Sequence, residues 1–252
     1  MGAHVNILGV SIDKVTVDGA ADRILEWIGQ PSNRARAVYT PNSEILMMAY
    51  RDESLREAIN RADMRTADGI GVVYAAKIVK NPLEQRAAGY DIACNLLEKL
   101  ARQGGSVYLF GAKPGVAEAA AKAMQSRYAG LEIAGCADGY FDAEKEQKII
   151  ADINDAQPDV LFVCLGAPKQ ELWIDQNRDT LSAKVCMGLG GCLDVFAGNV
   201  KRAPAAFQKL GLEWFYRLCK EPKRIGRMMD LPRFGMTALL HGKKFPQEGK
   251  QA

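Results

Sequence analysis

The chain has 252 residues and a formal net charge of +3, with 48% hydrophobic and 25% charged residues. These proportions are typical of a soluble globular protein, so we do not expect an intrinsically disordered chain. No apolar run approaches the ~18 residues that a membrane-spanning helix needs, and no basic lead precedes a long apolar stretch at the N-terminus. We therefore expect neither a transmembrane helix nor a signal peptide. The length suits one large α/β domain with an appendage, or two domains.

The positive charge is concentrated near the C-terminus. Between Gly211 and Phe245 there are eight lysine or arginine residues and three acidic ones, a net of +5 that leaves the rest at −2. A basic segment on a nearly neutral body is expected to meet phosphate groups or an anionic surface. The six cysteines include no Cys-x-x-Cys pair, which fits buried reduced thiols in a cytosolic protein better than a disulfide framework.

Apolar runs and helical stripes alternate along the chain. Strands are predicted at residues 5–10, 37–39, 64–67, 106–110, 131–136, 159–165 and 184–189, and helices at 18–28, 45–49, 54–61, 70–80, 92–102, 116–128, 143–156 and 171–178. This alternation predicts an α/β fold with a mostly parallel, Rossmann-like sheet flanked by helices. Ligands of such sheets bind at the carboxyl ends of the strands.

The composition changes after Pro204, where only helices are predicted, at residues 205–220 and 222–229. Pro222 suits the first turn of a new helix and stops the preceding one. The tail from Lys243 onward is expected to be disordered. We therefore divide the chain into an α/β catalytic domain, residues 1–202, and a basic amphipathic helical appendage, residues 203–252.

Polar side chains follow two predicted strands that flank a helix. Thr40 and Asn42 come directly after the strand at 37–39, and Asp68 comes after the strand at 64–67. At one edge of a sheet these groups would suit a general base with contacts to sugar hydroxyls. The structural alternative is that Asp68 caps the helix that starts at Ile70, because Asp and Gly are preferred at helix starts.

Several glycine-rich turns lie between strands and helices. Gly166-Ala-Pro-Lys-Gln170 could bind phosphate at a helix N-terminus or be an ordinary βα turn. Residues 69–71 and 188–191 lack the full Gly-x-Gly-x-x-Gly pattern in its required context. This argues against a nicotinamide-dependent dehydrogenase.

Three arginines of the basic segment, Arg217, Arg224 and Arg227, fall at helical spacing. They could form a solvated charged face. Apolar neighbours such as Trp214 and Phe215 instead make the segment amphipathic, as in helices that bind membrane surfaces. Arginine also forms bidentate contacts with phosphate oxygens.

Histidine is scarce, since His4 and His241 are the only two and lie near the ends. This weakens any histidine-based catalytic triad or metal site. No Asp-x-Asp sequence occurs, so a sugar-nucleotide enzyme built from this chain would need arginines to stabilise a leaving diphosphate. We expect no metal and no cofactor.

Motifs along nearly the whole chain resemble those of the TagA/WecG/CpsF bacterial glycosyltransferases, and in particular the N-acetylmannosaminyltransferases of wall teichoic acid synthesis. In order they are Thr40-Pro-Asn42-Ser-Glu, Ala67-Asp68-Gly69-Ile-Gly, Arg86-Ala-Ala-Gly-Tyr-Asp91, Asp138-Gly-Tyr-Phe141, Gly166-Ala-Pro-Lys-Gln170-Glu, Gly190-Gly-Cys-Leu-Asp194-Val-Phe-Ala-Gly, Lys201-Arg-Ala-Pro204 and Leu212-Glu-Trp-Phe-Tyr-Arg217.

The resemblance implies transfer of N-acetylmannosamine from UDP-N-acetylmannosamine to N-acetylglucosamine on undecaprenyl diphosphate, with inversion and without a metal. It implies a cytoplasmic protein held peripherally on the inner face of the cell membrane. By this resemblance Asp68 is the base, and the substrate-binding residues are Thr40, Asn42, Arg86, Gln170, Asp194, Arg217, Arg224 and Arg227. The last three would close over the diphosphate, in a segment also implicated in membrane docking and self-association.

Other readings stay open. The donor could be another UDP-sugar, such as the uronic acid of N-acetylmannosamine, and the chain could be a homo-oligomer. A non-catalytic UDP-sugar-binding module that regulates an envelope pathway is a further alternative. A nucleic-acid binder acting through the basic segment is disfavoured by the nearly neutral body.

Overall fold

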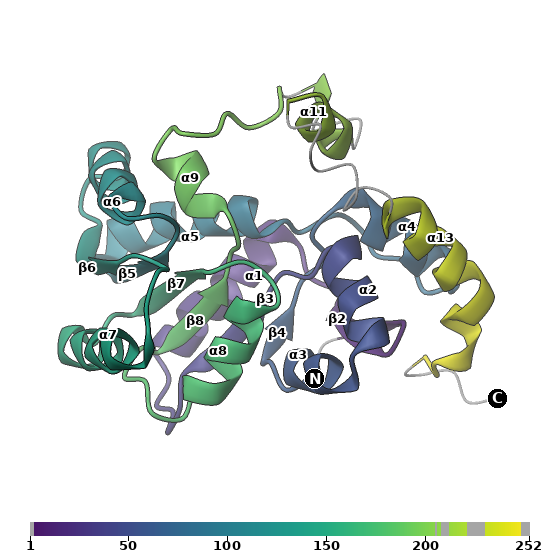
Figure 1. Ribbon diagram of the computed structural model, residues 1–252, viewed down its shortest axis with the longest axis horizontal. Helices are drawn as coiled ribbons and strands as arrows, with labels where there is room; N and C mark the ends of the chain where they lie inside the picture. Colours follow the sequence, from purple (N-terminus) through teal and green to yellow (C-terminus); the bar gives the residue numbers. More distant parts are fainter. Residues whose placement is uncertain (1–2, 205, 208–211, 221–229, 248–252) are drawn as a thin grey trace.

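A six-stranded parallel sheet forms the centre of the molecule (Figure 1). The structure is a computed structural model that describes residues 3–204, 206–207, 212–220 and 230–247. The strands are β3 (Arg36–Tyr39), β4 (Met64–Arg65), β5 (Ser106–Gly111), β6 (Glu132–Ala137), β7 (Val160–Cys164) and β8 (Val185–Gly188). They lie in the order β4-β3-β8-β7-β5-β6 and every pairing is parallel. The predicted Rossmann-like α/β fold is confirmed.

Helices cover both faces of this sheet. Because successive strand residues point to opposite faces, Val38 packs on one side and Tyr39 on the other. The side of Val38 is covered by α1 (Val17–Ile28), α5 (Gly89–Gln103), α6 (Val116–Arg127) and α9 (Cys192–Phe196). The core on the side of Tyr39 includes α2 (Ser43–Arg51), α3 (Glu53–Asn60), α4 (Ile70–Ile78), α7 (Ala143–Ala156), α8 (Lys169–Asn177) and α13 (Asp230–His241). All five residues of β7 are buried, as expected for a parallel strand covered on both faces.

The N-terminal residues form a hairpin, so the single strand predicted at 5–10 is wrong. Strands β1 (His4–Ile7) and β2 (Val10–Asp13) pair antiparallel around Leu8 and Gly9. Both turn residues have positive φ, 53° and 91°, as the two-residue turns that match strand twist require. Leucine is rare at such a position, and its side chain is fully buried here. The turn was missed because Leu8 looks like the middle of a strand.

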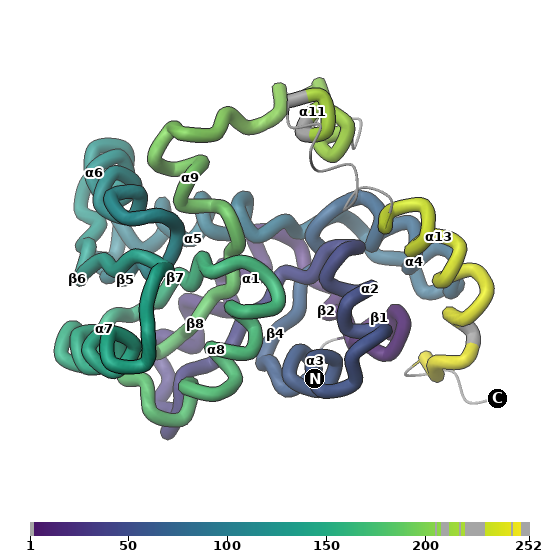
Figure 2. Tube along the Cα trace, in the orientation of Figure 1, coloured from purple at the N-terminus to yellow at the C-terminus, as the bar shows by residue number. Residues whose placement is uncertain are grey.

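The C-terminal segment packs against the body through α13. Phe234 and Ala238 are each 1% exposed and belong to the same core as α2 and α4, and Figure 2 shows α13 running beside α4. The described part of the predicted helix at 205–220 is interrupted at Leu212, and α11 spans Glu213–Lys220. The predicted helix at 222–229 lies outside the described residues. The division into two domains stays a prediction.

The tail continues in an ordered form beyond α13, through a 3-10 helix, η2 (Gly242–Lys244). The side chain of Gln247 accepts a hydrogen bond from the backbone N–H of Asn6 at 3.1 Å and donates one to its carbonyl oxygen at 2.9 Å. The expected disorder is therefore wrong for the described tail, which is bound to β1. Residues 248–252 lie outside the described part. Within the described ranges, no helix has the length and apolar character needed to cross a membrane.

Candidate active site

The loops that follow β3, β4 and β8 meet at the carboxyl edge of the sheet. From β3 the chain moves outward to β4, whereas from β5 it moves outward to β6 on the opposite side. The adjacent strands whose connections diverge are β7, which leads to β8, and β5, which leads to β6. Ligands of open α/β sheets bind outside the carboxyl ends of the strands, which is where the loops after β3, β4 and β8 lie. Thr40 follows β3, Asp68 follows β4 by three residues, and Gly190 follows β8.

Both the backbone and the side chain of Asp68 are held by hydrogen bonds. Its N–H donates to the carbonyl oxygen of Pro41 at 3.1 Å, which ties the end of β4 to the end of β3. The Asp68 carboxylate accepts a hydrogen bond from the N–H of Gly89, the first residue of α5, at 3.4 Å. The N-cap of α4 is Gly69, with φ of +100°. The interpretation of Asp68 as the cap of α4 is therefore wrong, because the carboxylate is directed at the start of α5.

Thr40 lies against the same helix start. Its hydroxyl donates to the carbonyl oxygen of Gly188 at 3.2 Å, and the residue is buried. A Cβ placed on Gly89 would lie 2.8 Å from the Thr40 hydroxyl oxygen and 3.1 Å from the Leu189 side chain. Gly89 thus lets the first turn of α5 pack between Thr40 and Asp68. The structure brings these two predicted residues together.

Asn42 lies on the other side of Asp68. Its amide oxygen accepts from the N–H of Ile45 at 3.0 Å and caps α2. A Cβ on Gly69 would be 4.0 Å from the Cβ of Asn42, so the two loops are in contact. Asn42 therefore has a structural role at the helix start while lining the same edge as Thr40 and Asp68.

Gln170 reaches the edge from α8 and is 2% exposed. Its amide oxygen accepts from the N–H of Gly190 at 2.8 Å, and its amide nitrogen donates to the carboxylate of Glu171 at 2.8 Å. Gln170 thus fixes the loop after β8. Glu171 fixes the orientation of the Gln170 amide.

The sequence patterns predict no role for Glu171. It is 1% exposed, and burial raises the pKa of its carboxyl group despite the hydrogen bond from Gln170. The Tyr39 hydroxyl donates to the Glu171 backbone oxygen at 2.9 Å. Nothing in the local sequence signals this burial, because an acidic residue in the first turn of a helix is usually exposed.

Asp194 lies at the same edge but farther along the sheet. It is partly buried in α9, close enough to Cys164 at the end of β7 to act on its thiol. Burial and, secondarily, the Asp194 charge raise the pKa of Cys164 to about 12. In the strand order β7 is separated from β3 by β8. Asp194 is therefore on the far side of the Gly188–Gly190 loop from Asp68.

Arg86 takes part in a network of ion pairs that joins the body to α11. It contacts Asp91 at 3.1 Å and also pairs with Glu213. Arg202 pairs with the same two carboxylates, at 2.9 Å to Asp91 and 3.2 Å to Glu213. The four side chains are only 15–29% exposed. We call Arg86, Asp91, Arg202 and Glu213 the charge network.

The charge network favours the ionised forms of Glu213 and Arg202. Burial alone would raise the pKa of Glu213, but the Arg86 and Arg202 guanidinium groups lower it below its usual value. Burial alone would lower the pKa of Arg202, but the Asp91 and Glu213 carboxylates raise it above its usual value. Arg86 is thus engaged with carboxylates in this structure, and its predicted contact with substrate stays a prediction.

The three appendage arginines lie wholly or partly outside the described residues. Arg217 belongs to α11, but its side chain lies outside the described part of the structure, as do Arg224 and Arg227 entirely. In Figure 1, α11 stands beyond the edge of the sheet, past the linker from α9. Within the described ranges, no group of three or more His, Cys, Asp or Glu residues is arranged to hold a metal ion.

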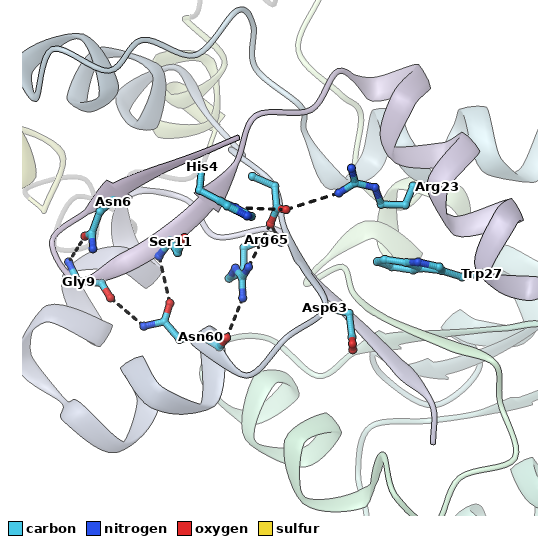
Figure 3. Close-up of a pocket in the computed structure, with 10 residues that line it drawn as sticks. His4, Asn6, Gly9, Ser11, Arg23, Trp27, Asn60, Asp63 and Arg65 are labelled. Atoms are coloured by element: carbon cyan, nitrogen blue, oxygen red, sulfur yellow. Dashed lines mark hydrogen bonds and ion pairs between the residues drawn. The ribbon is translucent and has the colours of Figure 1, made fainter. Parts of the chain in front are cut away.

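A hollow of about 660 Å³ lies at the N-terminal hairpin (Figure 3). Here His4, Arg23 and Arg65 converge on the Asp13 carboxylate, which is 3% exposed. Asp13 accepts from the backbone N–H of Arg65 at 2.8 Å and lies 3.4 Å from its guanidinium group. Since Arg65 is the last residue of β4 and precedes Asp68 by three residues, this carboxylate anchors the strand that leads to Asp68.

The fold and the edge together define an α/β enzyme with a carboxylate held among polar groups at the carboxyl ends of its parallel strands. The chain belongs to the glycosyl transferase WecG/TagA/CpsF family, whose model matches residues 5–248. It is therefore a glycosyltransferase, as the sequence resemblance predicts.

Two curated relatives carry the same name, N-acetylglucosaminyldiphosphoundecaprenol N-acetyl-beta-D-mannosaminyltransferase. The protein from Bacillus spizizenii is 39% identical over 218 residues, which is 86% of this chain and 84% of the relative. The protein from Staphylococcus aureus strain MRSA252 is 39% identical over 232 residues, or 92% of this chain and 91% of the relative. Each of these similarities covers more than four fifths of both chains.

Proposed function

We propose that this glycosyltransferase moves N-acetylmannosamine from UDP-N-acetylmannosamine to N-acetylglucosamine linked to undecaprenyl diphosphate. The acceptor and the transferred sugar are those in the names of the relatives from Bacillus spizizenii and Staphylococcus aureus. The product would be part of a teichoic acid linkage unit or a related envelope polysaccharide. Identity of 39% over most of both chains supports a shared reaction.

The observation that carries the proposed chemistry is the position of Asp68. Its carboxylate lies at the start of α5, beside Thr40 and at the carboxyl edge of the sheet. A carboxylate within reach of a substrate hydroxyl can act as a general base, typically contributing about 10²–10⁴ in rate. We assign this role to Asp68.

In the proposed reaction the acceptor hydroxyl oxygen attacks the anomeric carbon of the donor. A new carbon–oxygen bond forms as the bond to the diphosphate breaks, and UDP leaves with the electron pair. Asp68 takes the hydroxyl proton. A single displacement of this kind inverts the anomeric configuration. Thr40, Asn42 and Gln170 would surround the sugar, and Asp194 would lie near the nucleotide.

The leaving diphosphate needs positive charge. We propose that Arg217, Arg224 and Arg227 supply it, with Arg86 at the side of the body, so that no metal is required. The absence of an Asp-x-Asp sequence from the chain supports this assignment. The same basic segment would hold the protein on the anionic inner face of the cytoplasmic membrane, where a lipid-linked acceptor is found. Self-association is left open.

The test is a panel of UDP-sugars with a lipid-diphosphate-linked N-acetylglucosamine acceptor, with UDP release measured with and without a chelator. We expect release only with UDP-N-acetylmannosamine and no effect of the chelator. Turnover with the uronic acid donor would change the donor assignment, and chelator-sensitive turnover would contradict the metal-free mechanism. Binding of UDP-sugars without any release would favour the regulatory module.

A further inference from the structure

An apolar groove of about 330 Å³ runs between α4 and α13. This volume is at the lower end of the ~300–1,000 Å³ of small-molecule pockets. None of the ten described residues that line it carries a charge. They are Ile70, Gly71, Tyr74, Ala75 and Ile78 of α4, Leu231, Phe234 and Gly235 of α13, and Leu212 and Trp214 at the start of α11. We call this the α4–α13 groove.

The groove begins beside the proposed catalytic base. Ile70 and Gly71 are the second and third residues after Asp68. From there the lining residues of α4 follow at steps of three and four, which places them on one face of the helix. From Ile70 to Ile78 this face extends about 12 Å away from Asp68. The isoprenoid chain of an acceptor whose sugar lies at Asp68 could therefore reach the groove.

Two glycines of the groove differ in what surrounds them. At Gly71 a Cβ would lie 2.3 Å from the Ser43 hydroxyl oxygen and 2.9 Å from the Leu231 side chain, so close packing requires glycine there. At Gly235, no atom of the described residues lies within 4 Å of such a Cβ. Glycine weakens a helix interior, and packing does not require it at position 235. A larger side chain at position 235 would therefore enter open space at the lining of the groove.

The groove continues into an exposed apolar surface. Tyr74 is 56% exposed, and Leu239, which lies four residues after Gly235 on the same side of α13, is 60% exposed. Met236 and Leu240, 59% and 64% exposed, lie on other parts of the same helix. Several large apolar side chains exposed on one helix in this way indicate a contact with a partner or a membrane. The far end of the groove thus opens where a long apolar chain could leave the protein.

The charge network holds in place the wall of the groove that Leu212 and Trp214 form. Trp214 follows Glu213 directly, and Glu213 pairs with Arg86 and Arg202 of the body. The ion pairs therefore set the position of this apolar wall relative to α4.

We propose that the α4–α13 groove binds the first isoprene units of the lipid-linked acceptor, with the acceptor sugar at Asp68 and the diphosphate between the sugar and the groove. This subsite rests on the proposed function, since the acceptor class comes from it. The remainder of the isoprenoid chain would pass over Tyr74 and Leu239 into the membrane.

The direct test fills the groove from a position where a side chain has room. Gly235→Phe places a ring in the groove, and Met236→Phe adds aromatic bulk at the next, exposed position as a matched control. KM and kcat are measured in detergent for a polyprenyl-linked acceptor and for a water-soluble acceptor with a short alkyl chain. Farnesyl phosphate binding to both variants is measured by calorimetry, and thermal melting checks the fold.

We expect Gly235→Phe to raise KM for the polyprenyl acceptor about tenfold and to weaken farnesyl phosphate binding similarly. Its KM for the short-chain acceptor and its melting temperature should match the wild type, and Met236→Phe should change neither. If Gly235→Phe has the wild-type KM for both acceptors and the wild-type affinity for farnesyl phosphate, the groove is not the subsite. The same conclusion follows if Leu240→Glu weakens vesicle binding while Gly235→Phe has no effect.

Failure of the proposed function would look different. In that case the wild type would release no UDP with either acceptor, whatever the groove variants do. Farnesyl phosphate binding would still decide whether the groove takes an isoprenoid chain. Binding that Gly235→Phe abolishes supports the subsite, and binding that it leaves intact overturns it.

Discussion

The Asp68 carboxylate accepts a hydrogen bond from the backbone N–H of Gly89, 21 residues later, at 3.4 Å. Gly89 also packs within reach of the Thr40 hydroxyl, so one glycine at the start of α5 sets the spacing between two residues of the site. The position of the proposed base depends on this close approach.

Replacing Gly89 with alanine should separate these groups. The new Cβ would lie 2.8 Å from the Thr40 hydroxyl oxygen, so either the helix start or Thr40 must move. Misplacement of about 1 Å can cost roughly 10² in rate, and overpacking typically costs about 1–3 kcal/mol in stability. We expect kcat to fall between ten- and a hundredfold. Gly29→Ala, where a Cβ meets its nearest neighbour at 3.6 Å, should be neutral, and equal kinetics for both variants would contradict this account.

Buried Glu171 should make stability depend on pH. Burial raises the pKa of this carboxyl group, so its contribution to stability is fully present below the unfolded pKa of ~4.3 and is lost as pH rises through the folded value. Glu171→Gln keeps an acceptor for the Gln170 amide but removes the buried charge. Its melting temperature should exceed that of the wild type at pH 8 by a few degrees, since about 1 kcal/mol corresponds to roughly 2–4 °C.

The difference should vanish near pH 4, where the wild-type carboxyl group is protonated. Exposed Glu132 offers a control, because Glu132→Gln should leave the melting temperature unchanged at both pH values. A Glu171→Gln variant that is less stable than the wild type at pH 8 would show that the ionised carboxylate is stabilising.

The charge network should govern the attachment of α11. Glu213→Gln removes the carboxylate that Arg86 and Arg202 share, and both guanidinium groups lose a partner. We expect proteolysis in the linker between α9 and α11 to become roughly tenfold faster, equivalent to about 1.4 kcal/mol. High salt should shrink the difference by screening the wild-type ion pairs.

A matched control removes a solvent-exposed ion pair instead. Glu98 pairs with Arg102 within α5, and both side chains are more than half exposed. Exposed pairs of this kind contribute little, so Glu98→Gln should not alter cleavage. If both variants are cut at the wild-type rate, the network does not hold α11.

Asp13 should be important for stability although it is remote from the edge. Asp13→Ala would leave the Arg65 guanidinium group without its carboxylate partner inside the protein. Breaking a buried ion pair by removing one partner typically costs about 3–5 kcal/mol. Chemical unfolding should show a loss of this order, whereas Asp22→Ala, at a side chain 55% exposed, should cost under about 1 kcal/mol. Comparable losses for both would mean that Asp13 does not anchor β4.

The alternation of apolar runs was sufficient to predict the sheet and most helices, because period and length are local properties of the sequence. It failed at Leu8, where a buried leucine adopts positive φ, and at Gly89, which starts a helix within a stretch that looks like a loop. Both departures serve tertiary contacts. Local patterns cannot signal them.

The candidate site, too, could be predicted from the sequence only in part. Thr40, Asn42 and Asp68 could be found because they follow strands that a parallel sheet brings to one edge. The partner of Asp68 on α5, the burial of Glu171 and the pairing of Arg86 with Glu213 depend on contacts 21 to 127 residues apart or on packing. Such contacts leave no periodic trace in the sequence.

The central claim is that Asp68 removes the proton from the acceptor hydroxyl, and Asp68→Asn tests it most directly. UDP release with the lipid-linked acceptor and UDP affinity by calorimetry are measured in parallel, with Asp52→Asn, at the N-cap of α3, as the control. We predict that Asp68→Asn lowers turnover by about 10²–10⁴ while UDP affinity stays within about twofold, and that the control is unchanged. Wild-type turnover in Asp68→Asn would contradict the account.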